Sequence, residues 1–265
     1  MKKLFQSLLC FCLAVSVCAQ VPAPPVSTEP QKLTAAELDA LLGPIALYPD
    51  PLVAIILPAS ATPSDVVIAD RMVASKADPA TIEQQPWDPS VKALTHYPDV
   101  LKWMDDNLPW TTSVGNAFVN QPTDVMNSIQ QLRAKAKAAG NLTSNPQQTV
   151  EQQDEKIVIV PAEPAVIYVP QYDPQIVYVQ SATPVVAPLI TFGAGLAMGA
   201  WLSNGCNWYG GGVWCGGGYG WNNGSYHNNV NINNNININN NNWNHNNNNN
   251  WNHNNNNNLN HNNGG

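Results

Sequence analysis

The stretch IALYPDPLVAIIL, residues 45–57, has a near copy in THYPDVLKWM, residues 95–104. In both, Tyr-Pro-Asp precedes an apolar run. Proline suits the first turn of a helix because its missing N–H would be unpaired there, and an acid at that end meets the positive pole of the helix dipole. The triplet therefore predicts two helix starts. The alternative is that Asp50, Asp99 and His96 converge as a general acid–base cluster, which nothing in their spacing requires.

The same signals recur between residues 33 and 145 and predict a helical domain. Thr34 and Glu37 form a capping box, and Gly43-Pro44 ends the helix that follows it. The last helix is expected from Pro122 to about Ala139, with an apolar face and a stop at Gly140. Further starts are expected at Asp50-Pro51, Thr62-Pro63, Asp88-Pro89 and Pro98-Asp99, and the apolar face of the last helix at Val125, Ile129, Leu132 and Ala136.

Two adjacent acids in this domain do not form a paired-carboxylate site. Asp105 and Asp106 are neighbours on a predicted helix, so their side chains diverge by about 100°.

Residues 156–181 change from helical to alternating periodicity. Residues 163–169 and 173–179 are copies, EPAVIYV and DPQIVYV, each rich in β-branched and aromatic residues and flanked by proline. They predict two or three short strands in a small hairpin-like sheet, after a linker at 146–155. Tyr168 and Tyr178 are expected to pack across neighbouring strands, or alternatively to form an aromatic surface for a ligand.

The N-terminus, MKKLFQSLLCFCLAVSVCAQ, has the order of a secretory signal peptide: lysines, an apolar run, then small residues. We expect cleavage after Ala19, followed by a proline-rich tether at 20–32. The alternatives are lipoprotein processing at Cys18, which bulky Val17 opposes, and a retained anchor, for which the run is short. Losing two lysines leaves 9 basic against 18 acidic residues, a net charge of −9, which argues against a nucleic-acid partner.

Cleavage would also leave two cysteines, Cys206 and Cys215. In an oxidising compartment this pair predicts one disulfide, and Gly210–Gly212 allow the chain to turn back between them. The surrounding segment, residues 203–221, alternates aromatic residues with glycines. It suits a small self-packed hairpin or, alternatively, stacking against a sugar or peptide.

Residues 185–202, VVAPLITFGAGLAMGAWL, contain no charge, and Gly195 and Gly199 have the spacing of close helix contacts. As a helix the segment would be about 27 Å long, just short of the ~30 Å apolar core of a bilayer. We expect it to be buried or to lie at a membrane surface. A membrane span is the alternative, opposed by the lack of Lys or Arg after it.

The tail, residues 222–265, is 28 asparagines out of 44 residues. Residues 230–238 alternate Val or Ile with Asn, as in a strand with one apolar face. His245, His253 and His261 recur every eight residues, about 26 Å apart if extended, and so cannot share a metal ion. The tail is expected to self-associate through β-pairing, or alternatively to remain solvated and disordered.

Taken in order, ALYPDPLVAIIL, QPWDPSVKAL, HYPDVLKWM and VIYVPQYDPQIVYV resemble the bacterial exported family known as domain of unknown function thirty-three hundred. The resemblance covers roughly residues 33–181. It implies an envelope protein, and the family has no established catalytic residues to transfer to this chain.

The sequence therefore predicts a mainly α fold: a helical domain, a small β unit at 156–181, the apolar segment, the Gly/Trp-rich disulfide loop and the Asn-rich tail. We expect a non-enzymatic exported envelope protein with a structural or interaction role and with no catalytic, cofactor or metal site. Self-association through the tail and contact with the envelope or a membrane surface are the expected interactions, and no small-molecule substrate is identified. The alternative is an enzyme or chaperone-like factor acting on cell-wall material.

Overall fold

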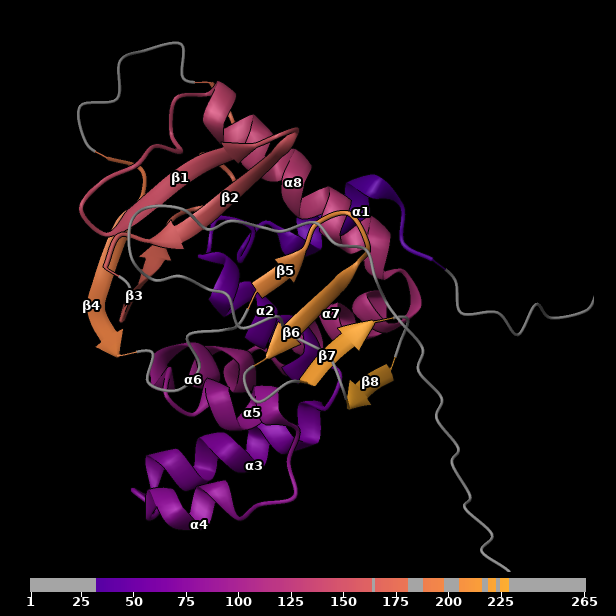
Figure 1. Cartoon of the computed structure of the whole chain (residues 1–265), viewed down its shortest axis with the longest axis vertical. Helices are drawn as coiled ribbons and strands as arrows, with labels where there is room; N and C mark the ends of the chain where they lie inside the picture. Colours follow the sequence, from indigo (N-terminus) through magenta and orange to yellow (C-terminus); the bar gives the residue numbers. More distant parts are fainter. Residues whose placement is uncertain are drawn as a thin grey trace, which may run out of the picture. The chain divides into compact units, whose positions relative to one another are not determined.

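The computed structural model of the chain describes residues 32–163, 165–180, 188–197, 205–215, 219–222 and 225–228. Figure 1 shows its helices and strands. Within these residues, eight helices precede all the strands, so the predicted mainly α character is confirmed. They are α1 (Ala35–Leu42), α2 (Asp50–Ala59), α3 (Pro63–Ala74), α4 (Pro79–Glu83), α5 (Pro89–Leu94), α6 (Pro98–Asp106), α7 (Leu108–Asn120) and α8 (Pro122–Ala138).

The predicted signals at the two ends of the helical domain are confirmed. The Thr34 hydroxyl accepts from the Glu37 N–H at 3.3 Å, and the Glu37 carboxylate accepts from the Thr34 N–H at 2.8 Å. Helix α8 buries Val125, Ile129, Leu132 and Ala136, and Gly140 follows it with a φ of +79°. Glycine adopts this left-handed backbone conformation without steric strain, so the helix ends there.

The internal helix starts use proline more than side-chain capping. Asp88 caps α5 by accepting from the Ser90 N–H at 2.7 Å, and Asp78 caps α4 in the same way. Thr62 and Tyr97 precede helices without capping them, and Asp50 is the first residue of α2. Helices α4 and α7 have no counterpart among the predicted starts.

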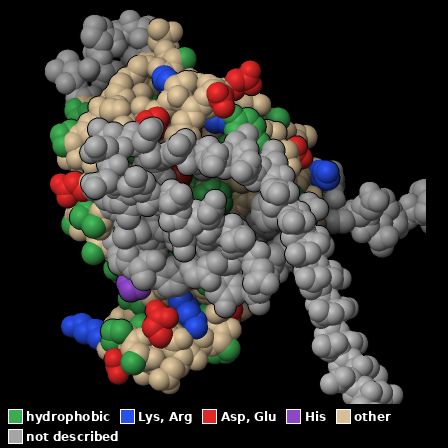
Figure 2. Space-filling model, viewed as in Figure 1, with side chains coloured by type: hydrophobic (Ala, Val, Ile, Leu, Met, Phe, Trp, Pro, Cys, Tyr) green, Lys and Arg blue, Asp and Glu red, His purple; other side chains and the backbone are tan. Residues whose placement is uncertain are grey.

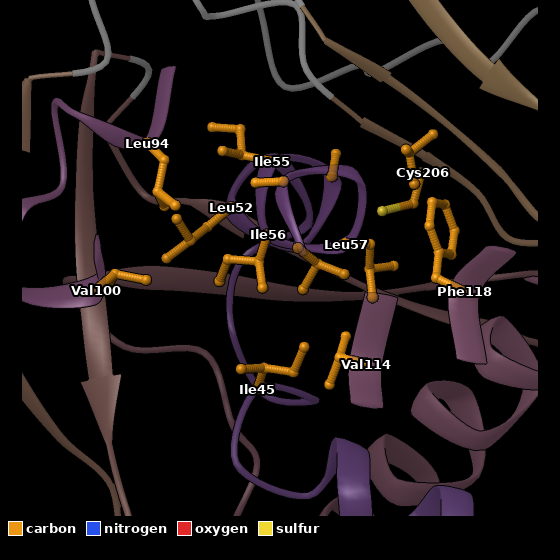
Figure 3. Packing of buried hydrophobic residues seen from close by; sticks show 14 of the residues in the cluster. Ile45, Leu52, Ile55, Ile56, Leu57, Leu94, Val100, Val114, Phe118 and Cys206 are labelled. Atoms are coloured by element: carbon orange, nitrogen blue, oxygen red, sulfur yellow. The ribbon is translucent and has the colours of Figure 1, made fainter. Parts of the chain in front are cut away.

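Helix α2, the apolar run of the first Tyr-Pro-Asp copy, is buried along its whole length. Figure 3 shows Leu52, Ile55, Ile56 and Leu57 spread around the helix, with side chains of α5, α6 and α7 packed about it. A helix that is apolar on every side is stable only when it is enclosed. This stretch therefore forms the centre of the hydrophobic core.

The strands form three antiparallel sheets within the described residues. β1 (Gln148–Gln153) pairs with β2 (Lys156–Pro161), β3 (Val166–Gln171) pairs with β4 (Thr191–Ala197), and the third sheet has the order β5-β6-β7-β8. The last four strands are β5 (Gly205–Asn207), β6 (Gly212–Cys215), β7 (Tyr219–Asn222) and β8 (Ser225–Asn228). Strand β1 occupies the segment predicted as a linker, and Asp154 turns the chain into β2 with a φ of +51°.

The two copied segments do not pair with each other. The first is β3, but residues 174–178 of the second form a turn. The hydroxyls of Tyr172 and Tyr178 both donate to the Gly43 carbonyl, at 2.9 and 2.6 Å, and Val177 is fully buried. These contacts hold the second copy against the helical domain, so the predicted pairing of Tyr168 with Tyr178 is wrong. Tyr178 instead meets Tyr172 edge to face, with ring centroids 6.3 Å apart.

Part of the apolar segment at 185–202 is a strand and not a helix. Residues 191–197 form β4, and Gly195 lies opposite Tyr168. A Cβ at Gly195 would lie 2.6 Å from Val166 Cγ1 and 2.9 Å from the Tyr168 ring. The absence of a side chain at Gly195 therefore allows close packing against strand β3, and not against a second helix. Residues 181–187 and 198–204, Gly199 among them, lie outside the described residues.

In the described part of the chain, no single helix is both long and apolar enough to cross a bilayer. Helices α2 and α3 together reach that length and composition, but they bend by 113° where they meet.

Candidate functional site

The carboxylate of Asp50 lies inside the protein with both oxygens engaged. Its Oδ1 is 2.6 Å from Arg133 Nη1 and also accepts from the backbone N–H of Ile159 at 3.2 Å. Its Oδ2 accepts from the indole N–H of Trp208 at 2.7 Å. Only 6% of Asp50 is exposed. The first Tyr-Pro-Asp aspartate is therefore the centre of a buried polar network.

Arg133, from the middle of α8, is fully buried and supplies the matching charge. Its guanidinium donates to three backbone carbonyls as well as to Asp50: Ala46 at 2.8 Å, Tyr48 at 2.9 Å and Ile157 at 2.8 Å. The Trp208 ring covers it, with 4.5 Å from Cζ to the ring centroid. A buried arginine needs this many partners because each unpaired N–H inside a protein costs free energy.

Gln130, one turn before Arg133, completes the network. Its side chain accepts from the N–H of Ile157 at 2.8 Å and donates to the carbonyl of the same residue at 3.0 Å. The Gln130 amide thus forms the same pair of hydrogen bonds with the backbone of β2 that a neighbouring strand would form. We call Asp50, Gln130, Arg133 and Trp208 the Asp50 cluster.

The Asp50 cluster joins four parts of the chain that are far apart in sequence: the start of α2, α8, β2 and the β5–β6 hairpin. Every charged oxygen and nitrogen described in it contacts the protein itself. A general base needs a lone pair that can reach a substrate proton. The geometry instead suits a structural connection between the helical domain and the β segments.

The second Tyr-Pro-Asp copy has a different environment. Asp99 and His96 are exposed near the start of α6, whereas Asp50 is buried. Tyr97 is buried, and burial raises its pKa to about 12. The two copies therefore both start helices, but the structure gives no support for a shared acid–base cluster.

On the face drawn in Figure 2, charged side chains are scattered over the described surface.

Three tyrosines line the contact between the α1–α2 loop and the turn at 174–178. Tyr172 accepts from the N–H of Leu47 at 3.1 Å, and its ring meets those of Tyr48 and Tyr178 edge to face. Burial raises the pKa of Tyr48 to about 12, and it raises the pKa values of Tyr172 and Tyr178 far above the usual tyrosine value. The three phenols thus stay protonated at neutral pH, and those of Tyr172 and Tyr178 donate to the Gly43 carbonyl.

The Gly/Trp-rich segment contains a hairpin packed on the core. Trp208, Cys206 and Val213 are buried, and Gly205 lies against Trp214 so closely that a Cβ would come within 2.4 Å of that ring. Gly211 has a φ of +71°, which suits the turn between β5 and β6. This supports the self-packed hairpin over an open aromatic surface for sugar stacking.

The structure describes the side chain of one of the two cysteines in the predicted Cys206–Cys215 disulfide. Cys206 lies opposite Val213 in the β5–β6 register, two residues before Cys215, and its Sγ is 3.5 Å from the carbonyl oxygen of Asp50. The Cys215 side chain lies outside what the structure describes. The pairing stays a prediction.

No group of three or more His, Cys, Asp or Glu side chains suited to a metal ion occurs within the described residues. The tail histidines, His245, His253 and His261, lie outside them.

Sequence reasoning missed Arg133, Gln130 and Trp208. One signal for Arg133 was present: it is four residues after Ile129 and three before Ala136, and so falls on the apolar face predicted for α8. A charge at such a position indicates a buried partner.

Comparison with known proteins places the chain in a family. It belongs to the family described as "Protein of unknown function (DUF3300)", whose model matches residues 34–258. It is 33% identical over 205 residues to "Uncharacterized protein YacH" of Escherichia coli (strain K12), an alignment that covers 62% of this chain and 33% of that protein. The chain thus spans about a third of the length of this relative. No solved structure matches it.

Proposed function

We propose that this is a non-enzymatic, exported cell-envelope protein whose folded part anchors and presents the Asn-rich tail for self-association or envelope contact. The observation that carries this proposal is the hydrogen bond from Trp208 to Asp50. It fixes the β5–β6 hairpin to the first residue of α2, the helix at the centre of the core. The Asp50 cluster therefore holds the β5–β6 hairpin, in the C-terminal part of the chain, against α2.

Composition supports the same role. After Asp173 the chain contains no Asp, Glu, Lys or Arg, whereas the segments before it carry all of the charge. Uncharged, Asn-rich segments have no electrostatic repulsion to keep copies apart. A charged, folded anchor with an uncharged tail suits a protein that attaches to other copies or to an envelope surface.

Export is the first part of the proposal to test. We expect the mature chain to begin at Gln20 in the periplasm, because the N-terminal residues have signal-peptide order with small residues before the cleavage point. Intact-mass measurement of exported protein distinguishes this from a lipid-modified Cys18. A chain that retains Met1 in the cytoplasm would overturn the envelope assignment.

Self-association is the second part of the proposal to test. We expect full-length protein to form assemblies with increased β signal as its concentration rises, because alternate Val and Ile residues at 230–238 gain by being covered. Light scattering and circular dichroism should detect both changes. A chain ending at Asn228, the last residue of β8, should remain monomeric.

A full-length control separates the apolar residues from tail length. The variant Ile232→Asn/Ile236→Asn/Ile238→Asn retains every other tail residue and leaves only Val230 on the apolar face of 230–238. We expect it to behave like the truncated chain. If full-length protein stays monomeric with no added β signal, the tail is a solvated brush and the self-association role is wrong.

A further inference from the structure

Strand β4 has a free edge. It pairs with β3 on one side, and within the described residues its other side has no strand partner. An edge strand presents unpaired N–H and C=O groups, which is where an additional strand can bind. Thr191, Ala194, Gly195 and Ala197 are exposed along it.

Natural proteins usually protect such edges with charge, proline or a bulge. The seven residues of β4, TFGAGLA, include no charge and no proline. One extra residue near Ala194 interrupts the register with β3, and the three residues that follow, Gly195 to Ala197, pair regularly. By contrast, β1 of the first hairpin carries Glu151. Of the three devices β4 therefore has only the bulge, and Gly195 to Ala197 beyond it form a regular edge without charge or proline.

The chain contains a segment suited to this edge. Residues 229–238, NVNINNNINI, are uncharged, contain no proline and alternate in the period of a strand. Phe192 and Leu196 of β4 pack partly against the two hydrophobic clusters of the core. An added strand with apolar residues on one face and asparagine on the other could extend this packing while keeping amides in water.

The segment begins directly after β8, which ends at Asn228. Figure 1 shows β4 and β8 on opposite sides of the described fold. Few residues are available to carry 229–238 back to β4 of the same molecule. A second copy has no such restriction.

We propose that residues 229–238 of one molecule add as a strand to the free edge of β4 in a second copy. This proposal rests on the proposed role of the tail in self-association and identifies the surface that receives it. Repetition of the contact from copy to copy is head-to-tail and produces open chains, unless the rotation closes a ring or two copies exchange tails reciprocally.

The test uses a peptide of residues 229–240 and, as receptor, the full-length variant Ile232→Asn/Ile236→Asn/Ile238→Asn, whose own tail cannot compete. We expect saturable binding by fluorescence anisotropy. Adding Ala197→Lys to the receptor should weaken binding about tenfold or more, because an edge lysine opposes strand addition. Ala138→Lys, the same substitution at an exposed site on α8, should leave binding unchanged.

A second peptide tests the backbone. N-methylation at alternate residues removes main-chain donors and leaves the side chains, so it should abolish binding if the contact is strand addition. Equal binding of the methylated peptide, or of the Ala197→Lys receptor, would overturn the proposal. Self-association of wild-type protein without peptide binding at β4 would also overturn it, while leaving the proposed function intact. Dimerisation of the receptor alone through β4 would assign the edge to a second β4 instead.

Discussion

Replacing Arg133 with Met is expected to lower the free energy of unfolding by about 3–5 kcal/mol, the cost of breaking a buried ion pair from one side. The Asp50 carboxylate would keep its burial but lose its countercharge. The carbonyls of Ala46, Tyr48 and Ile157 would each lose a donor. Urea denaturation followed by circular dichroism measures the change. Asp50→Ala should also be destabilising, because it leaves the buried Arg133 guanidinium without its countercharge.

A matched control lies two residues along the same helix. Lys135 pairs with Asp39 at 2.5 Å, but the lysine side chain is 51% exposed. Lys135→Ala should therefore cost no more than about 1 kcal/mol. Arg133→Lys tests geometry, because it retains the charge but cannot reproduce the planar fork that reaches several acceptors. If Arg133→Met and Lys135→Ala destabilise the protein equally, the Asp50 cluster does not hold the fold together.

Replacing Gly115 with Ala is expected to destabilise the protein by about 3 kcal/mol, the upper end of the usual cost of overpacking, although it should favour the helix itself. Alanine in a helix interior is better than glycine by about 1 kcal/mol. Gly115, however, lies where α7 crosses the end of α2, and a Cβ there would come within 2.0 Å of the Ser60 carbonyl oxygen and 2.8 Å of the Ala61 nitrogen. Backbone atoms cannot move aside as a flexible side chain can, so the helices must separate.

The neighbouring residue gives the control for this prediction. Asn116 is exposed on the same helix, and Asn116→Ala should change stability by less than about 0.5 kcal/mol. Thermal and urea unfolding of both variants show whether each substitution raises or lowers the free energy of unfolding. A Gly115→Ala protein as stable as wild type would mean that α7 and α2 are not in the close contact described.

Local signals predicted the helices best. The capping box at Thr34, the Asp88 cap and the stop at Gly140 depend on hydrogen bonds or backbone angles within a few residues, so they can be recognised without the fold. Asp78-Pro79 carries the same signal as Asp88-Pro89 and was overlooked. Helix α7 was not predicted, and its buried Gly115 is explained only by the crossing with α2.

The strands were predicted less well because their partners are distant. Residues 163–169 and 173–179 look alike, yet one is a strand and the other a turn held by tyrosine hydroxyls on Gly43. The partner of β3 came from a segment whose spacing of small residues suggested a helix. Pairing depends on which segments meet in space, and two similar sequences then experience different surroundings.

By itself, the sequence determined the positions and order of most helix starts, the apolar run that follows Asp50 and the change in composition beyond residue 173, because periodicity, capping and charge are local properties. Only the tertiary structure decided what Asp50 does. Its partners, Arg133, Ile159 and Trp208, are 83, 109 and 158 residues away. No local pattern encodes a contact between such distant positions, since it forms only when packing brings their backbones together and removes water from the charges.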